Sequence, residues 1–210
     1  DVFEHVSFGR LSFPDATMST RKGNIVALRE VLDKAHDKVL SIIEEKNPDL
    51  AEKEDVAEKV GIGAIIFGDL AHDRIHNITF EWDKVLDFQG ETAPYIQYTI
   101  ARINSILRKA SVDKEAIEIS LISGEEEKQL CSLIGSFNTA VNDAMKQKKP
   151  HHVAKFCITL AQRYNAYYVN HQVLQEDAAV QNARLAVCLA VKIALEQGLG
   201  LLGIEAPEEM

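Results

Sequence analysis

Apolar residues recur every three or four positions through most of this 210-residue chain, and that spacing constrains the fold more than any other feature. Such a period places apolar side chains on one face of an α-helix, which must then pack against another element. Asn47-Pro48 ends the first run, because proline disfavours helical geometry in the residue before it. The pattern predicts helices over residues 25–47, 52–72, 93–110, 123–149, 150–170 and 176–198.

The remaining segments do not follow the helical period. Residues 1–24 are typical of short strands and a loop. Alternation of Ile78, Phe80 and Trp82 predicts a short strand, and residues 111–122 form a polar connector with a locally extended part. We therefore expect a mainly α protein whose last 120 or so residues form a helix bundle.

Local signals mark several helix ends. Ser123 and Glu126 have the spacing of a capping box, in which Ser123 is the N-cap of the helix. Pro150 suits the first turn of the next helix, and Gly198 is placed to end the last one. Gly61 and Gly63 indicate close helix packing or a kink.

Charge is distributed unevenly along the chain. The net charge is −9, which by itself argues against nucleic-acid binding. Residues 1–93 hold most of that negative charge, whereas no acidic residue occurs between Asp143 and Glu176. That acid-free stretch contains five cations, so the local field is expected to be positive. They are Lys146, Lys148, Lys149, Lys155 and Arg163.

The cysteines, the histidines and the length of the apolar runs favour a protein with reduced cysteines, no metal site and no membrane span. Cys131, Cys157 and Cys188 each lie in an apolar helical pattern, which favours core packing in a cytosolic compartment. His72 and His76 are one helical turn apart, but no third ligand is evident, so no metal site is expected. We expect no membrane span either, because apolar runs fall short of the ~20 residues required.

The segment Thr17–Asn24 (TMSTRKGN) is polar, basic and placed between strand-like sequence and a helix start. Hydroxyls, backbone N–H groups and two cations at such a place suit a polyphosphate. A plain surface turn that leads into the helix is the alternative, and local physics alone favours it.

This segment resembles the mobile signature loop, usually written K-M-S-K-S, of class I aminoacyl-tRNA synthetases, in the form found in arginyl-tRNA synthetases. The resemblance implies ATP binding by Met18, Ser19, Thr20, Arg21 and Lys22. Of these, Ser19, Arg21 and Lys22 are implied to be catalytic, stabilising pyrophosphate during adenylate formation. The family's two lysines are replaced by Thr17 and Thr20, which shifts the cations to positions 21 and 22.

Two further stretches resemble the same family. Residues 80–83 with 90–102 are similar to the segment that joins the catalytic and anticodon domains. Residues 182–186, 198–199 and 202–210 are similar to the DALR anticodon-binding domain and its ending. The resemblance covers essentially all of the chain, and it implies a bundle of the class Ia anticodon-binding type preceded by a strand and loop remnant of the catalytic domain. The implied divisions are residues 1–25, 26–92 and 93–210.

Candidate RNA-binding residues come from the cations and aromatics that lie off the apolar stripes. Positive side chains attract phosphates, and exposed aromatic rings stack on unpaired bases such as those of an anticodon. A solvated basic face beside a bundle core is the alternative. The candidates are Arg102, Arg108, Lys109, Lys149, Lys155, Arg163, Tyr168, Asn170 and Met210. Arg184 lies within an apolar run, which favours a structural role.

The resemblance implies that the intact parent joins arginine to its tRNA through arginyl-adenylate, using ATP with Mg²⁺. The family's H-x-G-H signature is absent from these 210 residues, so we expect this piece alone to bind no ATP and to be inactive. We further expect a cytoplasmic monomer whose partner is an arginine-accepting tRNA. Two alternatives stay open: a helical protein-interaction module without RNA binding, and a synthetase of another amino-acid specificity.

Overall fold

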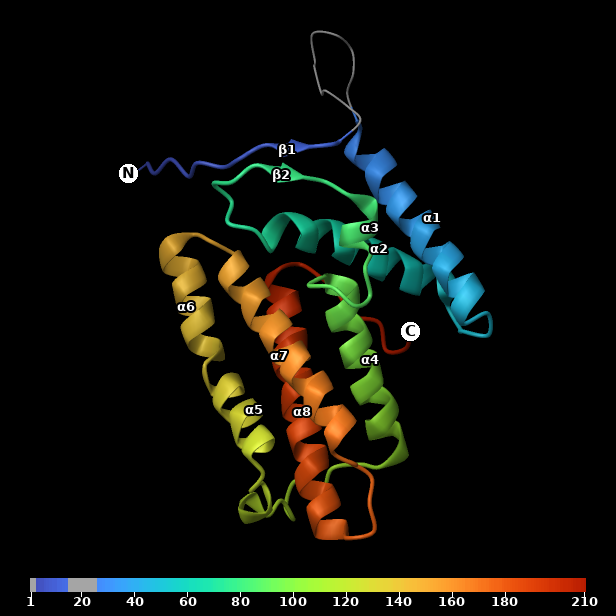
Figure 1. Ribbon diagram of the computed structural model, residues 1–210, viewed down its shortest axis with the longest axis vertical. Helices are drawn as coiled ribbons and strands as arrows, with labels where there is room; N and C mark the ends of the chain where they lie inside the picture. The colour runs from blue at the N-terminus through green and yellow to red at the C-terminus, as the bar shows by residue number, and fades with distance from the viewer. Residues whose placement is uncertain (1–2, 15–25) are drawn as a thin grey trace.

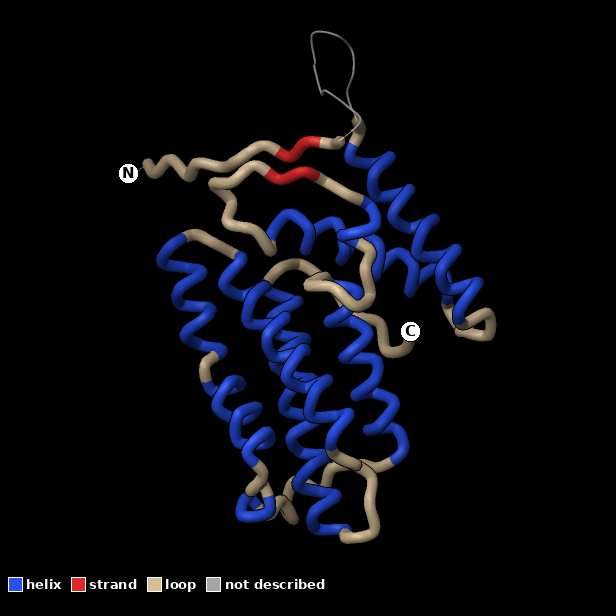
Figure 2. Tube along the Cα trace, viewed as in Figure 1, coloured by secondary structure: helices blue, strands red, loops and turns tan. Residues whose placement is uncertain are grey.

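The computed structural model describes residues 3–14 and 26–210, which form a helix bundle crossed at one end by a helical hairpin (Figure 1). The hairpin consists of α1 (Leu28–Lys46) and α2 (Lys53–Leu70). The bundle consists of α4 (Ala93–Lys109), α5 (Glu125–Gly135), α6 (Phe137–Gln147), α7 (His151–Asn170) and α8 (Ala178–Leu201). Figure 2 shows how little of the described chain is extended.

The hairpin forms because the apolar face of α1 packs against the largely apolar helix α2. On α1, Val31, Ala35, Val39 and Ile43 recur every four residues and are buried against α2. A Cβ atom at Gly61 would lie 3.0 Å from the backbone of Ala35. The close packing expected at this glycine is confirmed. α2 in turn contacts α4 and α7, which attaches the hairpin to the bundle.

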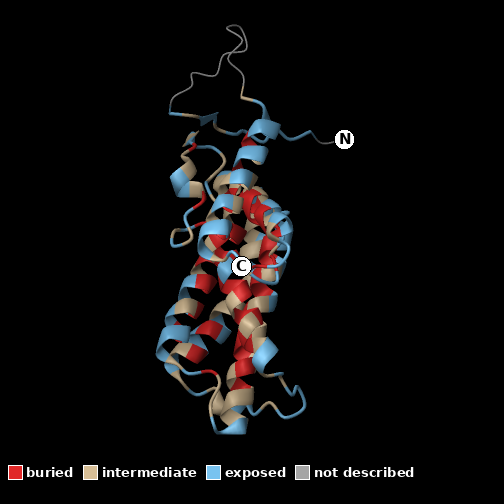
Figure 3. Ribbon diagram, turned by 90° about the vertical axis from the view of Figure 1, so that its right-hand side faces the viewer, coloured by how far each residue is buried: buried red, intermediate tan, exposed pale blue. Residues whose placement is uncertain are grey.

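α8 is the central helix of the bundle and contacts α4, α5 and α7. Among the described residues it is the one helix long and apolar enough to cross a membrane. Leu185, Cys188, Val191, Leu195 and Leu199 are nevertheless buried against the neighbouring helices, as Figure 3 illustrates for the bundle interior. We interpret α8 as a core helix, because those neighbours cover one apolar face of it, whereas Ile193 and Leu201 on its other side are exposed.

A short parallel pairing joins the N-terminal segment to the hairpin side of the molecule. β1 (Leu11–Ser12) pairs with β2 (Ile78–Thr79), with Leu11 opposite Ile78. The strand expected through Trp82 is shorter than predicted, because the single-turn helix α3 (Trp82–Val85) begins there. Phe13 and Phe80 pack with ring centres 5.1 Å apart just beyond the pairing.

Other boundaries also differ from the sequence expectation. Residues 123–149 form two helices rather than one, because the backbone N–H of Ser136 bonds the carbonyl of Leu133, three residues back, and its hydroxyl donates to the same carbonyl. The N-cap of α5 is Gly124 rather than Ser123, and its N–H donates to the carboxylate of Glu127. The extended part of the connector contains a 3-10 turn, η2 (Ile119–Leu121).

The end of the chain folds back along α4. α8 continues past Gly198 to Leu201, and Gly203, at φ +74°, makes the turn that follows. The fully buried Gln97 donates to the carbonyl of Glu205 at 2.7 Å and to that of Lys59 at 3.2 Å. This single amide therefore ties the C-terminal segment, α4 and α2 together.

Candidate nucleic-acid interface

α4 and α7 bring two tyrosines and an arginine together on the surface. The guanidinium carbon of Arg102 lies 4.9 Å from the ring centre of Tyr98 and 5.0 Å from that of Tyr168. Tyr98 retains 42% of its surface exposed and Tyr168 retains 38%. We call Tyr98, Arg102 and Tyr168 the tyrosine–arginine stack.

Hydrogen bonds between α4 and α7 support the stack from below. Asn165 of α7 accepts a hydrogen bond from the guanidinium of Arg102 and donates one to Thr99 of α4 at 2.8 Å. Behind it lies Tyr164, whose ring centre is 6.3 Å from that of Tyr168. Tyr164 is fully buried, and burial is the main cause that raises its pKa above the ordinary value. The stack is thus supported by a neutral, close-packed interior.

This arrangement suits single-stranded RNA. Exposed tyrosine rings stack on unpaired bases, and a guanidinium held beside them supplies a positive charge for phosphate or a base edge. Among the described residues Arg102 forms no ion pair with a carboxylate. Its charge is therefore available to a ligand.

Three of the predicted cations are both exposed and without an ion pair among the described residues. Lys155 and Arg163 lie on α7, and Lys109 lies in the last turn of α4. No ion pair to any of the three is found in the described part of the chain. Phosphate contact by these side chains would require no internal bond to break.

Four other predicted residues make internal contacts. Arg108 forms an ion pair with Glu209 at 3.1 Å, and Lys149 forms one with Asp73. Asn170 donates to Glu126 at 3.2 Å. Met210 packs against the hydrophobic cluster of the α1–α2 hairpin. These contacts join separate elements of the fold, so RNA contact by the same side chains would compete with them.

Tyr98 and Asn165 are not among the RNA-binding residues predicted from the sequence. Tyr98 precedes Arg102 by four residues, which places both side chains on one face of α4. That spacing was the available signal. No comparable signal pointed to Asn165, because its partners Thr99 and Arg102 are 66 and 63 positions away.

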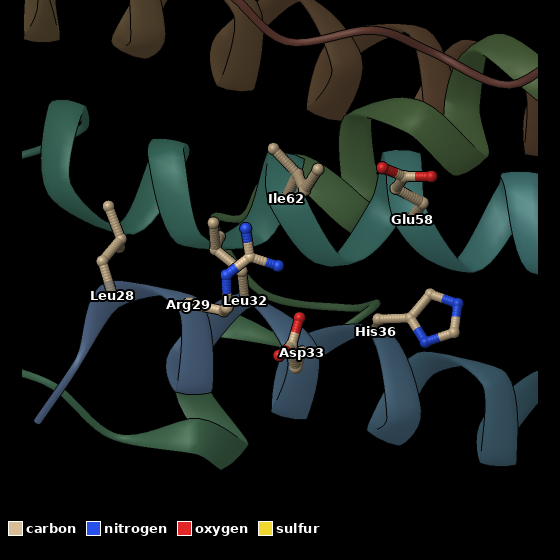
Figure 4. Close-up of a pocket in the computed structure, with 7 residues that line it drawn as sticks. All are labelled: Leu28, Arg29, Leu32, Asp33, His36, Glu58 and Ile62. Atoms are coloured by element: carbon tan, nitrogen blue, oxygen red, sulfur yellow. The ribbon is translucent and has the colours of Figure 1, made fainter.

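Two of the hollows beside the hairpin are lined partly by residues of α1. One, of about 490 Å³, lies between α1 and α2, and Figure 4 shows its lining side chains. Its lining holds one arginine, Arg29, and two carboxylates, Asp33 and Glu58, so it carries no excess of positive charge. The other, of about 620 Å³, holds Lys34 over the ring of Trp82 at 5.0 Å, beside Glu30 and Asp83. Neither concentrates positive charge as a phosphate site requires.

The signature-loop residues Met18, Ser19, Thr20, Arg21 and Lys22 lie outside the described residues. Their assignment to ATP and catalysis stays a prediction. Within residues 3–14 and 26–210, no group of three or more His, Cys, Asp or Glu side chains is placed to hold a metal ion.

The family models decide the classification. A model described as the DALR anticodon binding domain matches residues 96–210, more than half of the chain. The chain belongs to the DALR anticodon-binding domain family. A second model, described as the catalytic domain of class I (R) tRNA synthetases, matches residues 1–82. The resemblance read from the signature loop and the C-terminal motifs is confirmed; the domain boundaries at residues 25 and 92 stay a prediction.

The chain is also similar to curated arginine–tRNA ligases. The chain is 43% identical over 210 residues to the arginine–tRNA ligase of Leuconostoc mesenteroides. The aligned region covers 100% of this chain and 37% of the relative. It is 42% identical over 207 residues to the arginine–tRNA ligase of Clostridioides difficile, and this aligned region covers 98% of this chain and again 37% of the relative. The DALR chain therefore spans about 37% of the length of these relatives.

Solved structures confirm the fold class. The arginyl-tRNA synthetase of Thermus thermophilus superposes with a TM-score of 0.91 at 35% identity, over 98% of this chain and 35% of that one. The Plasmodium falciparum arginyl-tRNA synthetase superposes with a TM-score of 0.82 at 23% identity, over 98% of this chain and 35% of that one, and supports the fold alone. The expected helix bundle with a short strand and loop region is observed.

Proposed function

We propose that this chain is the tRNA-binding C-terminal part of an arginine–tRNA ligase, and that the tyrosine–arginine stack contacts the anticodon loop. The observation that carries this proposal is the placement of Tyr98, Arg102 and Tyr168 on one exposed face of a DALR bundle. An anticodon is unpaired, so its bases can stack on tyrosine rings.

The exposed cations extend this interaction to the RNA backbone. Lys155, Arg163 and Lys109 attract phosphates, and removal of any one of these charges should reduce the salt slope of binding by about one unit or slightly less. Arg108, Lys149 and Asn170 contribute less in this proposal, because each already bonds an acidic side chain. Met210 remains a candidate base contact near the folded-back C-terminal segment.

The intact parent would attach arginine to its tRNA in two steps, first forming arginyl-adenylate from arginine and ATP. Magnesium would accompany the ATP. Ser19, Arg21 and Lys22 would stabilise the pyrophosphate, with Met18 and Thr20 completing the ATP-binding loop. Similarity to arginine–tRNA ligases supports this activity. We further propose a monomeric, cytoplasmic enzyme.

The test is a fluorescence-anisotropy titration of the 210-residue chain with an arginine-tRNA anticodon stem-loop and with the same stem-loop carrying a swapped anticodon. We expect the native anticodon to bind tighter by about 1–3 kcal/mol per altered base. Tyr168→Ala and Tyr98→Ala should each weaken binding by about 1–3 kcal/mol, because each removes a stacking ring. Met145→Ala, which truncates another exposed apolar side chain, on α6, is the matched control.

Other results would favour the alternatives. Equal, salt-sensitive binding of both stem-loops would mean that the basic face contacts only phosphates. No RNA binding would favour a helical protein-interaction module. A preference for the anticodon of another amino acid would indicate a different specificity, against which the similarity to arginine–tRNA ligases already argues.

A further inference from the structure

We propose that Asn165 is a positioning residue, whose side-chain amide fixes the guanidinium of Arg102 between Tyr98 and Tyr168 before RNA arrives. This inference rests on the proposed anticodon contact and names the residue that organises it. Asn165 lies on α7 and its two partners lie on α4. The amide thus connects the two helices that make up the stack.

The direction of the hydrogen bonds orients the amide of Asn165. The hydroxyl of Thr99 donates to the carbonyl of Tyr95 at 2.9 Å, which uses its only proton. Its oxygen then accepts from Nδ2 of Asn165 at 2.8 Å. Because Nδ2 faces Thr99, Oδ1 faces Arg102 and accepts from the guanidinium. Thr99 is fully buried, so water does not compete for its hydroxyl.

Asn165 is uncharged, so its hold on Arg102 differs from that of an acidic side chain. Asn165 restricts the long arginine side chain, which otherwise samples many rotamers, and so lessens the ordering required on binding. It does so without cancelling the positive charge. An aspartate at the same position would form an ion pair with Arg102 and weaken its attraction for phosphate.

The contrasting explanation is that Asn165 only joins α4 to α7. In that case its removal would lower stability, and any effect on RNA would be independent of Arg102. A double-mutant cycle distinguishes the two, since residues that act through each other show non-additive effects.

The first experiment measures stem-loop affinity for wild type, Asn165→Ala, Arg102→Ala and the double variant, each checked for folding by circular dichroism. We expect Asn165→Ala to weaken binding about 3–10-fold in the wild-type background and by less than about 2-fold in the Arg102→Ala background. Asn165→Asp should also weaken binding and reduce the salt slope. Gln129→Ala, an exposed amide on α5, is the matched control and should change nothing.

The second experiment needs no RNA. In the free chain, the side-chain protons of Arg102 should show ring-current shifts from the two tyrosines. Asn165→Ala should move these NMR signals toward unfolded-chain values, whereas Asn165→Asp should retain the shifts. Unchanged Arg102 signals in Asn165→Ala would overturn the positioning role while leaving the proposed function intact. Changes in binding free energy from Asn165→Ala and Arg102→Ala that simply add in the double variant would do the same. If wild type fails to bind RNA, the proposed function fails and this inference fails with it.

Discussion

Glu127 and Arg184 form an ion pair inside the bundle, with 3.3 Å between Oε1 and Nε. Glu127 is 4% exposed and also accepts from the N–H of Gly124 and the hydroxyl of Tyr167. Arg184 donates in addition to the carbonyl of Gln172. The pair joins the first turn of α5 to α8, which confirms the structural role expected for Arg184.

Arg184→Met should lower the free energy of unfolding by about 2–4 kcal/mol, because it leaves the buried carboxylate of Glu127 without its cation. Urea denaturation followed by circular dichroism measures this change. Arg163→Met, which alters an exposed arginine on α7, should stay within about 0.5 kcal/mol of wild type. A decrease of similar size in both variants would contradict a specific role for the pair.

Two glycines of α8 should respond oppositely to the same substitution. A Cβ atom at Gly198 would lie 2.3 Å from the sulfur of Cys157, so Gly198→Ala should destabilise by about 1–3 kcal/mol through overpacking. Cys157→Gly in the same chain should relieve part of that specific clash. Gly200 has open space around its Cβ position, so Gly200→Ala should stabilise by about 0.5–1 kcal/mol. Equal effects at the two sites, measured by thermal unfolding, would refute the close approach of α7 and α8.

Stability should fall at alkaline pH. Burial raises the pKa of the Cys188 thiol to about 11 and that of the Cys157 thiol to about 12. Each thiol ionises in the unfolded chain near the ordinary value of 9.0, so between pH 9 and 11 the folded chain binds more protons. This contribution is complete below pH 9 and declines as pH rises, at about 1.4 kcal/mol per pH unit per thiol.

Urea unfolding at pH 8, 9 and 10 measures this slope. Cys188→Ala should make it shallower, whereas Cys131→Ala, which removes an exposed thiol whose pKa is raised less by burial, should change it less. A flat pH profile in wild type would show that the buried thiols do not control alkaline stability.

Gln97→Met should loosen the C-terminal segment. The substitution removes the donor that serves the carbonyls of Glu205 and Lys59, and removal of such buried bonds costs about 1–3 kcal/mol. Hydrogen exchange over residues 204–210 should accelerate relative to wild type. Gln129→Met is the control on α5, and no acceleration in Gln97→Met would mean that other contacts of the segment, such as that from Asn104 to Glu208, suffice to hold it.

The helices themselves were predictable because their signal is local. The apolar spacing located α1, α2, α4, α7 and α8 to within a few residues at most ends. Periodicity does not predict the break at Ser136, because it depends on the backbone N–H and the hydroxyl of one residue bonding a carbonyl three residues back. Thr92 caps α4 by accepting from the N–H of Tyr95, close to the predicted start at residue 93.

The candidate site was predictable only in part. Arg102 and Tyr168 were selected for charge and aromaticity, yet the sequence did not pair them, because contact across α4 and α7 follows from how both helices pack on α8. Lys149 and Arg108 looked like free cations, but their acidic partners lie 76 and 101 positions away along the chain. Distance along the chain says little about which charges neutralise each other.

The sequence by itself determined the helical elements and the family, because both are written in residues close together along the chain. Only the tertiary structure decided which cations stay available and which residues meet Arg102. The physical reason is that burial of the apolar faces fixes the helices against one another. Their outward side chains, such as Tyr98, Asn165 and Tyr168, are then placed by that packing rather than by their own neighbours in sequence.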